Sequence, residues 1–280
     1  MLLDIRLPRV LAAMLAGAAL AAAGAAYQGI FRNPLVSPDI LGVAAGASLG
    51  AVLGIFLSLP ILLIQLLAFA GGLAAVAVAA GIAAAVRGHE PAVVLVLAGI
   101  VVGTLAGSVV SLLKILADPY EQLPAITFWL LGSLASVNRD DVLTAAPLVL
   151  LGLGPLYLLR WRLNVLTQGE EEARALGVDA PRLRALVILA ATLATAAVVA
   201  ISGTVGWVGL AIPHLVRLLV GPDFGRLLPC TLLAGALFLL VVDTMARTIA
   251  ATEVPLGILT SLVGAPFFLW LLASGRRGWA

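Results

Sequence analysis

The sequence predicts an all-α membrane protein whose helices cross the bilayer repeatedly. Of its 280 residues, 62% are hydrophobic and 11% are charged, and the mean hydropathy is +1.17. These values lie far outside the range of a soluble domain. Apolar segments of about 20 residues recur, which is the length a helix needs to span a membrane, whereas the short alternating strands of an outer-membrane barrel do not occur. The net charge of +2 gives no indication of a nucleic-acid partner.

About nine apolar segments are predicted to cross the membrane as helices. In chain order they cover residues 10–30, 38–58, 60–86, 91–117, 141–160, 183–203, 206–220, 229–250 and 256–273. Glycine and alanine are dense in the first two, where small side chains let helix backbones approach closely. Residues 122–137 are too few and too broken to cross, so we expect a short helix there at one face or re-entering the bundle. The whole chain, 1–280, forms one predicted transmembrane domain.

The positions of arginine and lysine predict which helix ends face the cytoplasm, because cytoplasmic loops carry an excess of these residues. The side that we assign to the cytoplasm holds Arg32, Arg87, Arg160, Arg162, Arg174, Arg182, Arg184, Arg217, Arg226, Arg276 and Arg277. The other side holds Arg6, Arg9, Lys114, Arg139 and Arg247. This topology starts the chain outside without a convincing signal peptide. We therefore expect a preceding span to be missing from this sequence.

The longest strongly polar run, GEEEARALGVDAPRLR at 169–184, falls on the cytoplasmic side. Three consecutive glutamates begin a predicted helical turn and Gly177 ends it, as the preferences of helix termini favour. A second short helix is expected after Asp179, with Pro181 at its first position, where no amide donor is needed. Two short helices outside the membrane would form a knob for a partner. A solvated loop is the simpler alternative.

The chain contains no phosphate-binding loop. Lys114 is the only lysine and Ile115 follows it, so the sequence GK[ST] cannot occur. If the protein works by ATP, another subunit hydrolyses it, and the chain itself is predicted not to be an enzyme. The string GASLG at 46–50 matches the G-x-S-x-G form of a hydrolase, and with His214 it would suggest an intramembrane serine protease. Close packing of small residues explains the same spacing more simply.

Four acids lie near or within the spans: Asp118, Glu121, Asp243 and Glu253. A charge held in a membrane is often functional, so these residues raise the alternative of an ion-coupled secondary transporter. Asp243 precedes Arg247 by four positions, however, which puts both on one helix face and favours a structural ion pair. Asp118 and Glu121 are expected at the outer interface.

The residues that most often bind metals do not cluster in the sequence. His89 and His214 have no Cys, Asp or Glu group at ligand spacing, and Cys230 is the only cysteine. No metal site and no cofactor are predicted. On the outer side, Arg6, Arg9 and Arg247 are candidates either for anchoring to lipid or for receiving acidic groups of an external protein.

Several strings resemble one known family in order along nearly the whole chain. Near the start these are RLPR at 6–9, NPLV at 33–36, Pro38 and LGV at 41–43; later come SGTVGWVGL at 202–210, Pro213-His214, GPD at 221–223, EVPLG at 253–257 and GAPFF at 264–268. They look like the permease subunits of type II ABC importers for iron-siderophores, haem and cobalamin. That family usually has ten helices per subunit, with a first span before the RLPR string.

The resemblance implies a pore of two permease copies in a bacterial or archaeal cytoplasmic membrane, bound by a dimer of cytoplasmic ABC ATPase subunits and by an external solute-binding protein. It implies that the loop 164–184 couples to the ATPase through an E-x-x-A-x-x-x-G pattern, for which Glu170 fits best. The residues expected at this contact are Glu170, Glu171, Glu172, Ala173, Gly177 and Pro181. The binding protein is expected to dock on Arg6, Arg9 and Arg247. Iron-siderophore is the first expected cargo, followed by haem and cobalamin.

Overall fold

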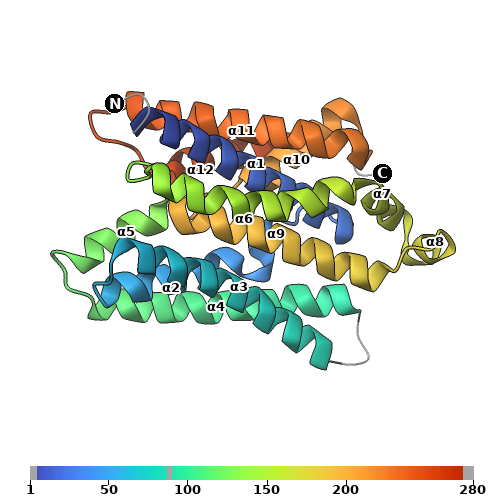
Figure 1. Ribbon diagram of the computed structural model, residues 1–280, viewed down its shortest axis with the longest axis horizontal. Coiled ribbons are helices and arrows are strands. Elements are labelled where there is room, and N and C mark those ends of the chain that lie inside the picture. Colours follow the sequence, from blue (N-terminus) through green and yellow to red (C-terminus); the bar gives the residue numbers. More distant parts are fainter. Residues whose placement is uncertain (1–4, 87–89, 274–280) are drawn as a thin grey trace.

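The computed structural model describes residues 5–86 and 90–273, and every regular element within them is a helix. The helices run back and forth along one long direction, so the bundle has two ends (Figure 1). In chain order they are α1 (Leu7–Ile30), the 3₁₀ turn η2 (Pro38–Leu41), α2 (Val43–Phe56), α3 (Ile61–Ala85), α4 (Pro91–Leu116), α5 (Gln122–Leu131), α6 (Arg139–Leu158), α7 (Arg160–Gln168), α8 (Glu170–Ala175), α9 (Ala180–Ser202), α10 (Val208–Val220), α11 (Phe224–Thr248) and α12 (Leu256–Ala273). We call the end that holds α7 and α8 the inner end and the opposite end the outer end.

Each predicted span contains a helix, although not all are long. In the described residues six helices, α1, α3, α4, α6, α9 and α11, are long and apolar enough to cross a membrane, and α2, α5, α10 and α12 are shorter apolar helices. The segment 38–58 is shortened because η2 precedes α2, and 206–220 because an irregular turn with Trp207 at a φ of +70° precedes α10. The short helix expected within 122–137 is α5, which ends at Leu131.

Helix α1 lies in the middle of the bundle and packs against α6, α9, α10 and α11 (Figure 1). Its contact with α11 is a backbone contact: a Cβ on Gly17 would lie 2.1 Å from the carbonyl oxygen of Gly235. A Cβ on Gly24 would likewise lie 1.8 Å from the carbonyl oxygen of Gly209 in α10. The glycines of the first span therefore pack as predicted, by letting helices touch without side chains between them.

The G-x-S-x-G string belongs to the tight contact between α2 and α3. A Cβ on Gly46 would lie 2.3 Å from the carbonyl oxygen of Gly71, and one on Gly50 would lie 2.0 Å from that of Leu67. Ser48 is buried between these glycines. The structure supports close packing as the reason for this spacing.

Candidate functional site

The polar run at the inner end folds into a small helical knob built from α7 and α8. Gly169, with a φ of +147°, turns the chain between the two helices. α8 ends in a left-handed cap: Gly177 has a φ of +75°, its N–H donates to the carbonyl of Arg174 at 3.0 Å, and the N–H of Val178 donates to that of Ala173 at 2.8 Å. This pair of bonds is a Schellman motif. The predicted terminus at Gly177 is confirmed.

The second short helix expected after Asp179 does not exist as a separate element. Pro181 lies in the first turn of the long helix α9, and the Asp179 side chain accepts from the N–H of Arg182 at 3.1 Å to cap it. Proline near a helix start needs no amide partner, so nothing interrupts α9 before Ser202. The knob therefore consists of α7 and α8.

The knob has a buried side and an exposed side. Ala173 is fully buried against the bundle, whereas Glu171 and Glu172 are exposed and Leu176 is 61% exposed at the tip. The side chain of Glu170 lies outside the described side chains. α8 thus presents two carboxylates and one leucine to solvent on a helix with a defined end.

Helix α7 is fastened to the start of α11. The Asn164 side-chain amide donates to Asp223, and its carbonyl oxygen accepts from the N–H of Phe224 at 2.6 Å. The N–H of Gly225 also donates to Asp223, at 3.1 Å. The pKa of Asp223 lies below its ordinary value, chiefly because the Gly225 N–H donates to its carboxylate and secondly because the Asn164 amide does. Asp223 is thus an ionised cap that joins α7 to α11.

At the outer end one arginine joins three parts of the chain. Arg9 Nη2 lies 2.8 Å from Asp243 Oδ1 in α11 and 2.6 Å from Glu253 Oε1 in the α11–α12 loop. Arg9 Nε and Nη1 donate to the same two carboxylates, at 2.9 and 3.0 Å. The Asp243 side chain is fully buried and only 11% of the Arg9 side chain is exposed. The fork of one guanidinium thus holds two carboxylates at once.

Glu253 extends this outer cluster. Burial opposes its ionisation, but the hydrogen bond and charge of Arg9, a hydrogen bond from the Ser133 hydroxyl at 3.2 Å and the charge of Arg247 outweigh burial. The pKa of Glu253 therefore lies below its ordinary value. Because Ser133 belongs to the α5–α6 loop, the cluster also reaches the end of α5.

The structure separates the three outer arginines that the sequence grouped. Arg247 Nη2 lies 3.2 Å from Asp243 Oδ2, so the predicted pair within α11 is confirmed, and Arg247 remains partly exposed. Arg6 is exposed at the start of α1. Arg9 is turned inward instead, which sequence reasoning missed because its partners lie 234 and 244 residues away. Asp243 and Glu253, two of the four acids on which the ion-coupled alternative rested, are thus paired with arginines within the chain.

The remaining candidate residues have local structural roles or lie outside the description. Asp118 accepts from the N–H groups of Tyr120 and Glu121, both at 2.9 Å, and so orders the turn before α5. His214 is buried in α10, and His89 lies outside the described residues. Within the described ranges, no group of three His, Cys, Asp or Glu residues is arranged to hold a metal ion.

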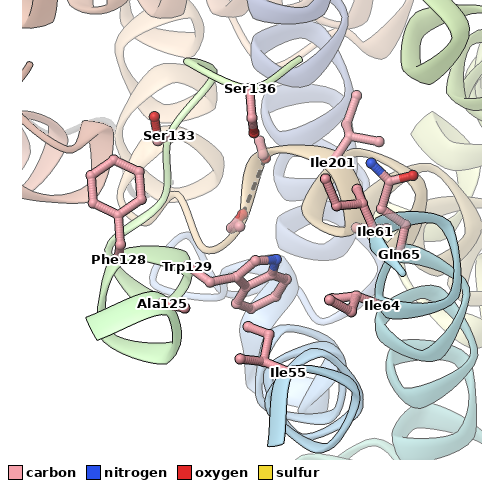
Figure 2. Close-up of a pocket in the computed structure, with 13 residues that line it drawn as sticks. Ile55, Ile61, Ile64, Gln65, Ala125, Phe128, Trp129, Ser133, Ser136 and Ile201 are labelled. Carbon is pink, nitrogen blue, oxygen red and sulfur yellow. Dashed lines mark hydrogen bonds between the residues drawn. The ribbon is translucent and has the colours of Figure 1, made fainter. Parts of the chain in front are cut away.

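A cavity of about 260 Å³ lies between the ends of α2, α3, α5 and α9, next to the outer cluster (Figure 2). Figure 2 shows Trp129 and Ile55 at its wall, with Ser133 above them. The backbone N–H of Ser133 donates to the Ser202 carbonyl at 2.8 Å, and the Gln65 amide donates to Asp141 at 2.8 Å. No charged side chain is among the described residues that line the cavity. It is a mainly apolar recess with Gln65, Ser133, Ser136 and Ser202 as the polar side chains at its wall.

Comparisons with known proteins agree along almost the entire chain. A family model described as the FecCD transport family matches residues 1–274. The molybdate import system permease protein MolB of Haemophilus influenzae is 43% identical over 277 residues, which cover 98% of this chain and 81% of the relative. The cobalamin import system permease protein BtuC of Halobacterium salinarum is 46% identical over 269 residues, covering 96% of this chain and 72% of the relative.

The backbone agrees with the sequence match. A solved structure described as an inward-facing conformation of a metal-chelate type ABC transporter superposes with a TM-score of 0.92 at 43% identity, covering 97% of this chain and 86% of that chain. A sequence identity above 40% together with a closely superposing backbone indicates that these proteins are related, and not only that they share a fold.

Proposed function

Because the chain belongs to the FecCD transport family and is a permease of an ABC importer, we propose that it forms half of a pore driven by separate ATPase subunits. It is a multi-pass protein of the cytoplasmic membrane. The observation that carries the proposal is the family match over residues 1–274. Family members are not catalytic themselves, so ATP hydrolysis is assigned to the partner. One transmembrane domain, 1–280, holds the segment 164–184 as its coupling loop.

The ATPase is proposed to bind the exposed side of α8. The contact comprises Glu170, Glu171, Glu172, Ala173, Gly177 and Pro181, with Leu176 added because it stands exposed at the tip. Ala173 is fully buried, so it supports the contact from behind by seating α8 on the rest of the chain. Two or three carboxylates beside an apolar tip suit a cleft with a cationic rim.

Copurification tests this contact. Reversing the exposed carboxylates by Glu171→Lys with Glu172→Lys should abolish recovery of the ATPase with the permease, while thermal unfolding stays near that of the wild type. Asp140→Lys is the matched control, because it reverses an exposed carboxylate at the outer end. If the double variant retains the ATPase as well as the control does, α8 is not the docking element.

The external binding protein is proposed to dock on the outer arginines, with unequal roles. Arg6 and Arg247 are exposed and suited to acidic groups of a partner. Arg9 lies behind them and holds Asp243 and Glu253. We therefore assign direct contact to Arg6 and Arg247, and assign to Arg9 the positioning of that surface.

Charge reversal tests the outer surface. Arg6→Glu with Arg247→Glu should abolish docking of the binding protein to the permease in nanodiscs, with the ATPase still bound. Arg139→Glu is the control, because Arg139 is an exposed outer arginine outside the proposed set. Docking that survives the double reversal would contradict the assignment.

A second copy of the chain is proposed to complete the pore against α4. This helix exposes Thr104, Ser108 and Ser111 on one face, at helical spacing, within a span whose one charged residue is Lys114 in its last turn. Each hydroxyl donates to a carbonyl one turn earlier, at 2.8, 3.0 and 2.9 Å. The oxygens of these exposed hydroxyls can still accept hydrogen bonds from water, so a face that carries three of them suits the wall of a pore.

Cross-linking tests the second copy. Ser108→Cys in a Cys230→Ser background should yield a disulfide-linked dimer in membranes, and Leu62→Cys on exposed α3 should not. A monomer from Ser108→Cys alongside efficient cross-linking at Leu62 would place the interface elsewhere.

The cargo is proposed to be a metal chelate, with an iron-siderophore first and haem or cobalamin next. Relatives named for cobalamin and molybdate import support a metal-bearing cargo of varied size. A wall of hydroxyls and apolar side chains offers little chemical selection, so selectivity falls to the binding protein. Identifying the ligand that copurifies with that protein tests the assignment.

A further inference from the structure

We propose that α1 and α11 form one rigid strut that links the ATPase contact to the outer docking surface, and that Asn164 is the residue that fastens α7 to this strut. The inference rests on the function proposed above. It adds a physical route between the two partner sites and names the joint at which that route can be cut.

The joint at the inner end uses both halves of one amide. Asn164 donates through its nitrogen to Asp223 and accepts through its oxygen from the N–H of Phe224 at 2.6 Å. Asparagine is one of the few side chains that offer a donor and an acceptor side by side. Two bonds to adjacent residues fix the direction as well as the distance between α7 and the first turn of α11.

The same turn of α11 is seated on α1. Phe224 is 1% exposed, and a Cβ on Gly29 would lie 2.6 Å from Cζ of its ring. The absence of a side chain at Gly29 therefore makes room for Phe224. A movement of α7 that pulls on the Phe224 N–H acts on α11 and α1 together.

Two further contacts keep α1 and α11 together across the membrane. In the middle, Gly17 and Gly235 bring the two backbones into direct contact. At the outer end, Arg9 of α1 pairs with the buried Asp243 of α11 at 2.8 Å. The three contacts are spread along the length of α1 and α11, so neither helix can slide past the other.

The strut ends where the binding protein is proposed to dock. α11 has 25 residues, a length of about 37 Å at 1.5 Å per residue. Asp223 caps its inner end, whereas Arg247 lies at its outer end and one turn from Asp243. Displacement of the knob by the ATPase is therefore transmitted to the outer surface. Because coupling between two binding equilibria is reciprocal, docking outside must also alter nucleotide binding inside.

The test is the coupling factor between the two partner sites, measured on the full complex in nanodiscs. The dissociation constant of the cargo-free binding protein is measured with and without the ATP analogue AMP-PNP. For the wild type we expect the two constants to differ by a factor on the order of 5–150. In Asn164→Ala this ratio should fall toward one, although both partners still bind.

Two further variants separate coupling from folding. Thr167→Ala removes a hydroxyl that donates to the backbone carbonyl of Asn164 within α7, at 2.7 Å, and leaves the Asn164 side chain untouched, so the ratio should stay as in the wild type. Asn164→Asp places two carboxylates side by side, so the ratio of the two dissociation constants should fall toward one. Adding Asp223→Asn to it exchanges the two side chains, restores a donor facing an acceptor, and should restore the ratio.

The outcomes distinguish the strut from the function on which it rests. Failure of the wild type to bind an ATPase or a binding protein would overturn the proposed function. Wild-type coupling in Asn164→Ala, or no recovery in the exchanged pair when it folds and binds both partners, would overturn the strut alone.

Discussion

The outer cluster around Arg9 and the inner knob differ in whether their charged side chains are buried and paired or exposed. At the outer end Arg9 and Asp243 are buried, and each carboxylate of the cluster faces at least one guanidinium within the chain. At the inner end Glu171 and Glu172 stand exposed on a helix one and a half turns long. Buried charges require fixed partners, whereas exposed charges remain available to a partner that is not part of the chain. The outer cluster thus fastens three parts of the chain together, whereas the inner knob presents its charge to solvent.

This contrast predicts that removal of a buried charge damages the fold, whereas changes at the knob damage association. Replacement of Arg9 by leucine should have the largest effect. Asp243 would keep only Arg247, and removing one partner of a buried ion pair costs about 3–5 kcal/mol. The thermal unfolding midpoint in detergent should fall markedly. Arg6→Leu, at an exposed position, should leave it unchanged. An unaltered midpoint for Arg9→Leu would contradict the fastening role.

The next largest effect is expected where α1 meets α11. In Gly17→Leu the new Cβ would lie 2.1 Å from the Gly235 carbonyl, so the helices must separate, and overpacking of this kind costs about 1–3 kcal/mol. Gly81→Leu is the matched control, since no atom lies within 4 Å of a Cβ there. Thermal unfolding of both variants checks the prediction, which fails if the two lose equal stability.

A smaller effect is expected at the cap of the knob. Gly177→Ala forces a Cβ into a left-handed conformation, at a cost of about 1–2 kcal/mol. The last turn of α8 should open more often, so amide hydrogens of residues 173–178 should exchange faster while the global unfolding midpoint stays the same. Gly154→Ala in α6, where space is open, should leave this exchange rate unchanged. Equal exchange in the two variants would contradict the cap.

The smallest effect is expected from titration of Glu253. Its pKa in the folded protein lies below the ordinary value of 4.5, so its contribution to stability is complete above that value. The contribution is lost as the pH falls through the folded-state pKa. Unfolding midpoints of the wild type and of Glu253→Gln should therefore differ at pH 6 and converge on acidification below pH 4.5. A difference that does not shrink on acidification would contradict the assignment.

Rules for helix ends and for residue spacing along a helix were sufficient to predict contacts between residues that are close in the sequence. The cap at Gly177, the cap at Asp179 and the pair of Asp243 with Arg247 all involve residues within a few positions of each other, and each was predictable from helix geometry. The same rules failed for the second short helix. Pro181 is compatible both with a new short helix and with the first turn of a long one, and packing of α9 decided between them.

The contacts that join the helices were not predictable from local patterns. Asn164 and Phe224 are 60 residues apart, and Arg9 and Asp243 are 234 apart. No sequence feature near Arg9 distinguishes it from Arg6. The two arginines differ in the direction in which the start of α1 points their side chains. The family resemblance of the RLPR and SGTVGWVGL strings, now confirmed by the family match, supplied the fold but not these pairs.

The central position of α1 also has a consequence for biogenesis. Within one 18-residue stretch of this helix 72% of the residues are buried, yet its contacts in α9 and α11 are synthesised long after it. About 220 residues separate the end of α1 from the end of α11, which at about 5–20 residues per second is a wait of roughly 10 to 40 s. During that interval its glycine-lined surface faces lipid or the insertion machinery. The packing surface of α1 is therefore completed only after α11 has been made.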